Sequence, residues 1–297
     1  MRYPAHAAFY APAEQHASLW RLVLGIVVIL IVFAAVLGGF FGVLVAIVGR
    51  EVATSWVAAL QEPDTPITTL AVLATFLGMA LATISGALAL HRRGLASLVG
   101  QNGRVRADFF GGAGIAIALL ITSLGWFLLR HDVVHNLPIK TWLIFLPLGL
   151  LGILLQTGAE ELLFRGYLQQ QLAARFASPL VWMGLPALLF GFAHFDPASM
   201  GASAFLMLVA TLIFGLLAAD LTAHTGSIAA AWGFHFANNC LAILTVSVPG
   251  SISGLSLYLT PFRLHDTEIL ATMIAQDIAI TLLIWGLIRV SLRRRQQ

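Results

Sequence analysis

The chain has 297 residues, of which 59% are hydrophobic and only 10% are charged. Soluble globular proteins carry about 25% charged residues, so this composition excludes an ordinary soluble domain. The single cysteine, Cys240, excludes an internal disulfide and a cysteine-rich metal site. The formal charge of +3 comes from basic residues that flank apolar segments, without an aromatic-interleaved basic patch, so we expect no nucleic-acid partner.

Eight apolar segments reach or approach the length of about 20 residues that a helix needs to cross a bilayer. Because these runs are continuous rather than alternating, we predict an all-α integral membrane bundle of about eight transmembrane helices. The fifth segment is short, and the sixth and seventh lie close together, so seven spans are the nearest alternative. The segments are 22–48, 67–90, 111–129, 141–160, 180–195, 203–223, 228–248 and 268–290.

Basic residues predict the orientation, because they gather in cytoplasmic segments. With the N-terminus inside, four basic residues fall on the outer side and the other twelve of the 16 fall inside. We therefore expect a multi-pass protein of the cell (inner) membrane with both termini cytoplasmic. The outer residues are Arg50, Arg130, Lys140 and Arg263, and the inner ones include Arg2 and Arg295.

We predict four parts along the chain. They are a cytoplasmic N-terminal segment (1–20), a transmembrane scaffold (21–140), a catalytic core (141–248), and a last transmembrane helix with a basic tail (249–297). We expect the first 20 residues to be loosely ordered, because they mix polar and apolar types. Polar residues that must enter the membrane cluster between Gln156 and Asn239, so the chemistry is expected in the core.

Glu160 and Glu161 stand at the end of an apolar run. A charge at bilayer depth costs about 2.5–3.5 kcal/mol, so such a pair persists only if it is solvated, paired or used. Glu161 and Arg165 are four residues apart on a helix and can form an ion pair. Glu160 points about 100° away and is the candidate general base. A structural ion-pair cluster that ties helices together is the alternative.

Phe190 and His194 share one face of the next predicted helix. The segment 175–179 ends in a proline, which cannot continue a helix. Residues 160 and 194 are equally distant from this break, so antiparallel helices would hold both side chains at one level. The end of the apolar run places Glu160 near the cytoplasmic boundary, whereas the length of helix between the break and His194 places His194 deep in the membrane. Both placements hold if the stretch between the two residues rises above the lipid surface. A packing role is the alternative for His194.

His235 and Asn239 are also four residues apart and face the same way. Two such donors could stabilise the negative oxygen of a tetrahedral intermediate. The alternative is an interhelical hydrogen-bonding pair, for which His and Asn are suitable.

Together these residues form a minimal set for activating water against an amide carbonyl. Glu160, His194 and His235 also form a candidate zinc site with an open fourth position, so zinc and metal-free glutamate mechanisms are equally open. The chain has no HExxH or GxGD pattern. Gly201-Ala202-Ser203-Ala204 lacks the glycine that a rhomboid-type serine motif requires.

At these motifs the chain resembles the CAAX protease and bacteriocin-processing family of intramembrane endopeptidases, also called CPBP or Abi. The match runs through 160–168 (Glu-Glu-Leu-Leu-Phe-Arg-Gly-Tyr-Leu), 190–194 and 235–239. The resemblance implies about eight spans, a cavity open to the cytoplasmic side, and a membrane-associated peptide or protein substrate. It also implies three paired roles: Glu160 and His194 activate water, Glu161 and Arg165 brace the site, and His235 and Asn239 form the oxyanion hole.

Two other functions are consistent with the sequence. Acidic and His side chains in membranes serve as ion relays in transporters, and Asp220 and Asp277 lie within apolar runs that could extend one. Neighbouring side chains could equally satisfy both carboxylates. A non-catalytic immunity protein that kept the fold is the other alternative.

Overall fold

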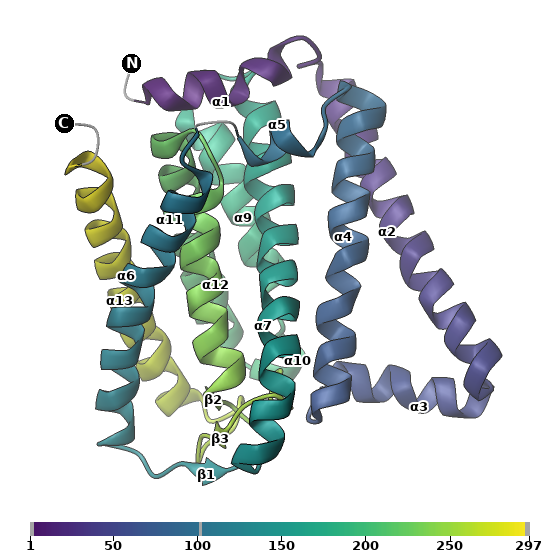
Figure 1. Cartoon of the computed structure of the whole chain (residues 1–297), viewed down its shortest axis with the longest axis vertical. Coiled ribbons are helices and arrows are strands. Elements are labelled where there is room, and N and C mark those ends of the chain that lie inside the picture. The colour runs from purple at the N-terminus through teal and green to yellow at the C-terminus, as the bar shows by residue number, and fades with distance from the viewer. Residues whose placement is uncertain (1–2, 101–102, 295–297) are drawn as a thin grey trace.

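The computed structural model describes residues 3–100 and 103–294. Long helices run up and down the molecule, and short helices and strands cap the two ends (Figure 1). The helices are α1 (Pro4–Glu14), α2 (Leu19–Val48), α3 (Arg50–Gln61), α4 (Pro66–His91), α5 (Leu95–Val99), α6 (Val105–Leu128), α7 (Ile139–Glu161), η1 (Leu162–Gln169), α8 (Gln170–Ala173), η2 (Leu180–Gly184), α9 (Leu185–Ala193), α10 (Pro197–Met200), α11 (Ser203–Thr225), α12 (Ala229–Leu244) and α13 (Thr267–Arg294).

All eight apolar segments form helices, which confirms the predicted all-α bundle. Within the described ranges, six helices are long and apolar enough to cross a membrane, so the number of eight is not confirmed by length and composition. The two segments outside this group are the shorter η2–α9 run and α12. The six are Leu19–Val48, Pro66–His91, Val105–Leu128, Ile139–Ala173, Ser203–Thr225 and Thr267–Arg294.

The outer surface of the bundle is apolar. Leu30, Ile31 and Leu151 are each about 60% exposed, where a soluble protein would present polar side chains. Exposed large apolar residues recur on α2, α4, α6, α7 and α13. Such a belt is stable when lipid surrounds it, which agrees with a multi-pass membrane protein.

One helix extends further than predicted. The run that begins at Ile139 continues without a break through α7, η1 and α8 to Ala173. Glu160 therefore lies 13 residues, or about 20 Å, below the end of this run rather than at its boundary. The chain then turns and descends through η2 and α9 to His194. The helix break predicted at 175–179 is confirmed, and the longer run places Glu160 and His194 at comparable levels.

The first helix is docked rather than loosely ordered, so that expectation is wrong. α1 lies across the end of the bundle (Figure 1), and it buries His6, Phe9 and Ala13. The His6 ring lies 4.3 Å from the Trp182 ring. Burial lowers the pKa of His6 to about 4, so this side chain is neutral in the folded protein at pH 7. The apolar stripe of α1 provides the area that docks it.

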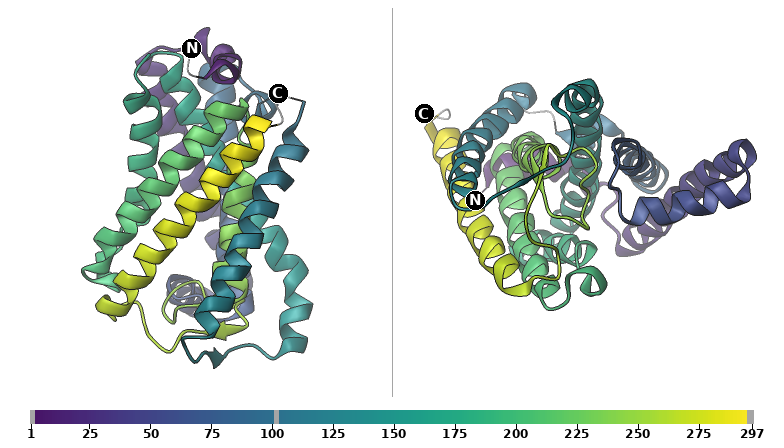
Figure 2. Two further views of the ribbon diagram at one scale, coloured as in Figure 1. Left: turned by 90° about the vertical axis from the view of Figure 1, so that its left-hand side faces the viewer. Right: turned by 90° about the horizontal axis from the view of Figure 1, so that it is seen from below.

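Two features at the edges of the molecule were not predicted. Gly49 has a φ of 82°, which a glycine adopts without strain, and it turns the chain from α2 into α3. These two helices lie at one edge, outside the main bundle (Figure 2, right). At the end opposite α1, strands β1 (Val134–His135), β2 (Val246–Ser247) and β3 (Tyr258–Leu259) form a small sheet in the order β1-β3-β2.

Helix α12 occupies the interior and contacts α6, α7 and α11. Protein rather than lipid surrounds it, so it can carry polar side chains that a lipid-facing helix could not. Its approach to α6 depends on Gly233, because a Cβ atom there would lie 2.0 Å from the carbonyl oxygen of Phe109.

We expect Gly233→Ala to destabilise the protein. Overpacking a core costs about 1–3 kcal/mol, and the upper end applies here because the clash is with backbone that cannot rotate away. Detergent-induced unfolding followed by tryptophan fluorescence measures the change. Gly114→Ala on α6 is the matched control, since a Cβ there meets nothing within 4 Å. Equal stabilities of the two variants would contradict the close α6–α12 packing.

Candidate active site

The two glutamates are the last residues of α7 and are both buried. Arg165 lies on the adjoining π-helix η1, and its Nη1 atom donates to Glu161 Oε1 at 2.9 Å. The predicted Glu161–Arg165 ion pair is therefore confirmed. The π-helix was not predicted, although π turns within α-helices frequently mark functional sites.

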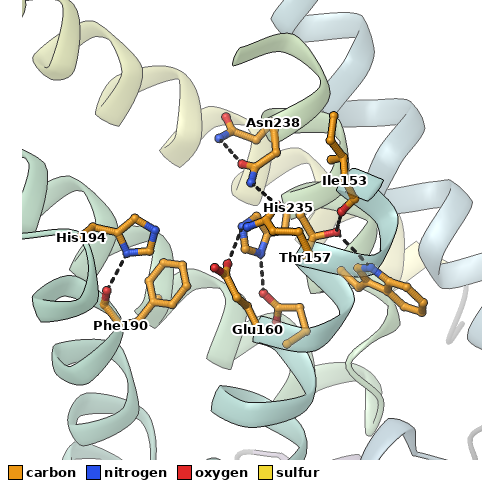
Figure 3. A network of polar contacts seen from close by, with 12 residues as sticks. Ile153, Thr157, Glu160, Phe190, His194, His235 and Asn238 are labelled. Carbon is orange, nitrogen blue, oxygen red and sulfur yellow. Dashed lines mark hydrogen bonds and ion pairs between the residues drawn. The ribbon is translucent and has the colours of Figure 1, made fainter. Parts of the chain in front are cut away.

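His235 bridges the two carboxylates (Figure 3). Its Nδ1 lies 2.9 Å from Glu161 Oε1, and because a carboxylate only accepts, Nδ1 carries the proton. Its Nε2 lies 3.4 Å from Glu160 Oε2, a contact that is an ion pair when the ring is doubly protonated and that is not a hydrogen bond. Oε2 of Glu160 therefore has no hydrogen-bond donor within the described part of the chain and stays available as an acceptor.

Aromatic rings and a carbonyl surround the guanidinium of Arg165. The group lies 4.9 Å from the Phe190 ring and 6.0 Å from the Phe214 ring. Its Nη2 also donates to the Gly215 carbonyl at 3.4 Å. The side chain is 2% exposed, so Arg165 is a buried cation whose charge balances Glu161.

Asn239 lies one helical turn from His235 on α12 and also faces α7. Its Nδ2 donates to the Oε1 of Gln156 at 2.8 Å. Gln156 was not among the predicted site residues. Its spacing from Glu160 could have identified it, because Gln156–Glu160 and His235–Asn239 are both four residues apart on helices that run antiparallel.

His194 lies next to Phe190, which it follows by one helical turn. Its Nδ1 donates to the Phe190 carbonyl at 2.8 Å, which leaves Nε2 as the free ring nitrogen. The Phe190 ring lies 4.6 Å from the His194 ring and 5.9 Å from the His235 ring. The free nitrogen faces the side on which Glu160 and His235 lie (Figure 3). The structure thus brings His194 to the site but not into hydrogen-bond contact with Glu160.

The candidate zinc ligands do not form a three-ligand site. Among residues 3–100 and 103–294, no three His, Cys, Asp or Glu side chains are placed to hold a metal ion. Glu160 and His235 approach each other within 3.4 Å, whereas the His194 ring packs against the Phe190 ring. The arrangement of these side chains therefore does not fit zinc.

Three other polar residues from the sequence lie outside this cluster. Asp220 accepts hydrogen bonds from Tyr3, Trp285 and Arg289, so its charge is satisfied at the end of the bundle. Asp277 is exposed on α13 and does not extend a buried relay. The buried hydroxyl of Ser203 makes no hydrogen bond within the described ranges, so it has no base to activate it.

Comparison with known proteins identifies the segment that carries this site. Residues 138–241 match the family described as type II CAAX prenyl endopeptidase Rce1-like. The uncharacterised protein YyaK of Bacillus subtilis (strain 168) is 35% identical over 113 residues, which cover 38% of this chain and 37% of YyaK. The match therefore spans little more than a third of that relative, and no solved structure matches the chain. Residues 138–241, which include all six predicted site residues, are thus similar to the Rce1-like family, and the resemblance read from the three motifs is confirmed for this part of the chain.

Proposed function

We propose that this protein is an intramembrane endopeptidase that hydrolyses a peptide bond of a membrane-associated peptide or protein. The observation that carries the proposal is the buried network in which His235 bridges Glu160 and Glu161, with Arg165 balancing the second carboxylate. Four charged or chargeable groups buried together are costly unless they are used or fully paired. Here Glu160 keeps one oxygen without a hydrogen bond, which suits a group that must accept a proton.

In the proposed reaction Glu160 acts as general base. It removes a proton from a water molecule while the water oxygen attacks the carbonyl carbon of the scissile bond. The free Nε2 of His194 accepts the second hydrogen of that water and orients it. The tetrahedral intermediate collapses when Glu160 returns its proton to the amide nitrogen, the C–N bond breaks, and the amine leaves.

In this proposal two residues on α12, Asn239 and His235, supply the donors that stabilise the oxyanion. Asn239 uses one N–H on Gln156 and has a second to give. In this proposal His235 is doubly protonated, so that Nδ1–H donates to Glu161 and Nε2–H, which lies 3.4 Å from Glu160 Oε2, is the donor for the oxyanion. Donors fixed before the reaction need no reorganisation, which is the physical basis of oxyanion-hole catalysis.

Removing metal ions should leave activity unchanged within about twofold, because the donor set does not form a three-ligand site. The measurement compares initial cleavage rates before and after dialysis against a zinc chelator. Chelator-free dialysis serves as the control for loss of protein during handling. A loss of activity that added zinc restores would instead favour a metal-dependent mechanism.

The activity test uses the purified chain in proteoliposomes. Two internally quenched peptides of one sequence are offered, one with a farnesylated cysteine four residues from its C-terminus and one without the lipid. Cleavage of either peptide supports the proposal, and the ratio of the two rates reports whether a lipid anchor is required. A chain that is folded but cleaves neither peptide contradicts the proposal and favours a non-catalytic role.

We further propose that both termini face the cytoplasm. α1 and the C-terminal end of α13 lie at the same end of the bundle (Figures 1 and 2). Arg2 and Arg295 lie outside the described residues, but Arg293 and Arg294 close α13 at this end, and α4 ends there at His91 with Arg92 as its C-cap. A basic end of the bundle supports a cytoplasmic placement.

A further inference from the structure

We propose that Gln156 is a positioning residue, which acts through Asn239 and sets the direction of its side-chain amide. The inference rests on the proposed function, in which Asn239 stabilises the oxyanion. Its basis is one contact between two helices, the 2.8 Å hydrogen bond from Asn239 Nδ2 to Gln156 Oε1. Gln156 is only 7% exposed, so its carbonyl oxygen is largely shielded from competing water.

The contact belongs to a two-rung arrangement between α7 and α12. In the first rung Glu160 faces His235, and in the second Gln156 faces Asn239. Each helix contributes residues four positions apart, which lie one above the other on one face. The same interhelical approach therefore sets the place of the general base and the place of the amide donor.

The orientation of Gln156 in this structure favours one orientation of the Asn239 amide, because the Gln156 oxygen faces the Asn239 nitrogen. A carboxamide can rotate by 180° and exchange its oxygen and nitrogen at little cost. Gln156 presents an oxygen, which accepts only from the Asn239 nitrogen. On the opposite side, Asn238 Nδ2 donates weakly to Asn239 Oδ1 at 3.5 Å. Without Gln156, the amide can turn its oxygen toward the developing negative charge, where it repels rather than stabilises.

The test compares Gln156→Met, Asn239→Ala and the double variant on the peptide that the wild type cleaves faster. Methionine keeps the length of the side chain and removes the carbonyl acceptor. Gln171→Met is the matched control, because Gln171 is a buried glutamine on the same helical run whose polar atoms make no hydrogen bond within the described ranges. We measure kcat and KM separately for each variant.

We expect Gln156→Met to lower kcat roughly tenfold at unchanged KM. Removing one oxyanion donor lowers kcat by about 10²–10³-fold, and a misdirected Asn239 should lose part of that contribution. In the Asn239→Ala background the same change should cost less than about twofold, since its target is gone. Equal losses in both backgrounds, or a loss matched by Gln171→Met, overturn the inference while the proposed function stands. A wild type that cleaves neither peptide overturns both.

Discussion

Replacing Glu160 with glutamine should abolish peptide cleavage and lower kcat by about 10³-fold or more, because the amide cannot take a proton from water. The substitution keeps the size of the side chain. It also leaves the structural pairs intact, since His235 and Arg165 both bind Glu161 through hydrogen bonds at 2.9 Å. Within residues 3–100 and 103–294, the ion-pair contact of Glu160 is the longer one, at 3.4 Å from Oε2 to His235. The loss should therefore be catalytic rather than structural.

The measurement is the initial rate on the two quenched peptides in proteoliposomes. Size-exclusion chromatography and thermal unfolding report whether the variant is folded. Glu268→Gln is the matched control, because it makes the same chemical change at an exposed position in the first turn of α13. An active Glu160→Gln variant, within tenfold of wild type, would remove the glutamate-base mechanism.

Replacing Arg165 with methionine should destabilise the protein by about 3–5 kcal/mol, the range found when one partner of a buried ion pair is removed. Glu161 is fully buried and would lose its main cation. The methionine side chain fills most of the space between the Phe190 and Phe214 rings, so the loss is mainly electrostatic. The free energy of unfolding in mixed detergent micelles measures it.

A double variant separates charge from packing. Glu161→Gln combined with Arg165→Met removes both charges, and we expect it to recover at least half of the lost stability. The amide oxygen at position 161 can still accept from His235. Arg263→Met provides the control, since it removes an exposed arginine outside the bundle core. If the double variant is as unstable as Arg165→Met, the ion pair is not what holds this region together.

Local periodicity explains the part of the site that was predictable. Residues four apart on a helix are neighbours whatever surrounds them, so the Glu161–Arg165 pair follows from the covalent geometry of the helix. The equal distances of Glu160 and His194 from the break at 175–179 likewise follow from the constant rise of a helix. Apolar composition was sufficient to predict each of the eight helical segments.

The extent of the helices was less predictable. The sequence placed the end of the fourth segment at residue 160, because charge and polar residues begin there. The structure continues the helix to Ala173, since Gln169, Gln170 and Gln171 are buried against protein and need not leave the bundle. The docking of α1 was missed for a related reason, because its apolar stripe is short and gains stability only from the surface that it covers.

The helical membrane bundle, the positions of its helices along the chain, and the contacts made within a single helix all follow from the amino-acid pattern. Three contacts depend on the tertiary structure: His235 bridges both glutamates, Gln156 meets Asn239, and the Phe190 ring packs against both His194 and His235. The physical reason is that a contact between two helices depends on their relative rotation and offset. Packing of many side chains sets these two quantities together, and the pattern of one segment does not contain them.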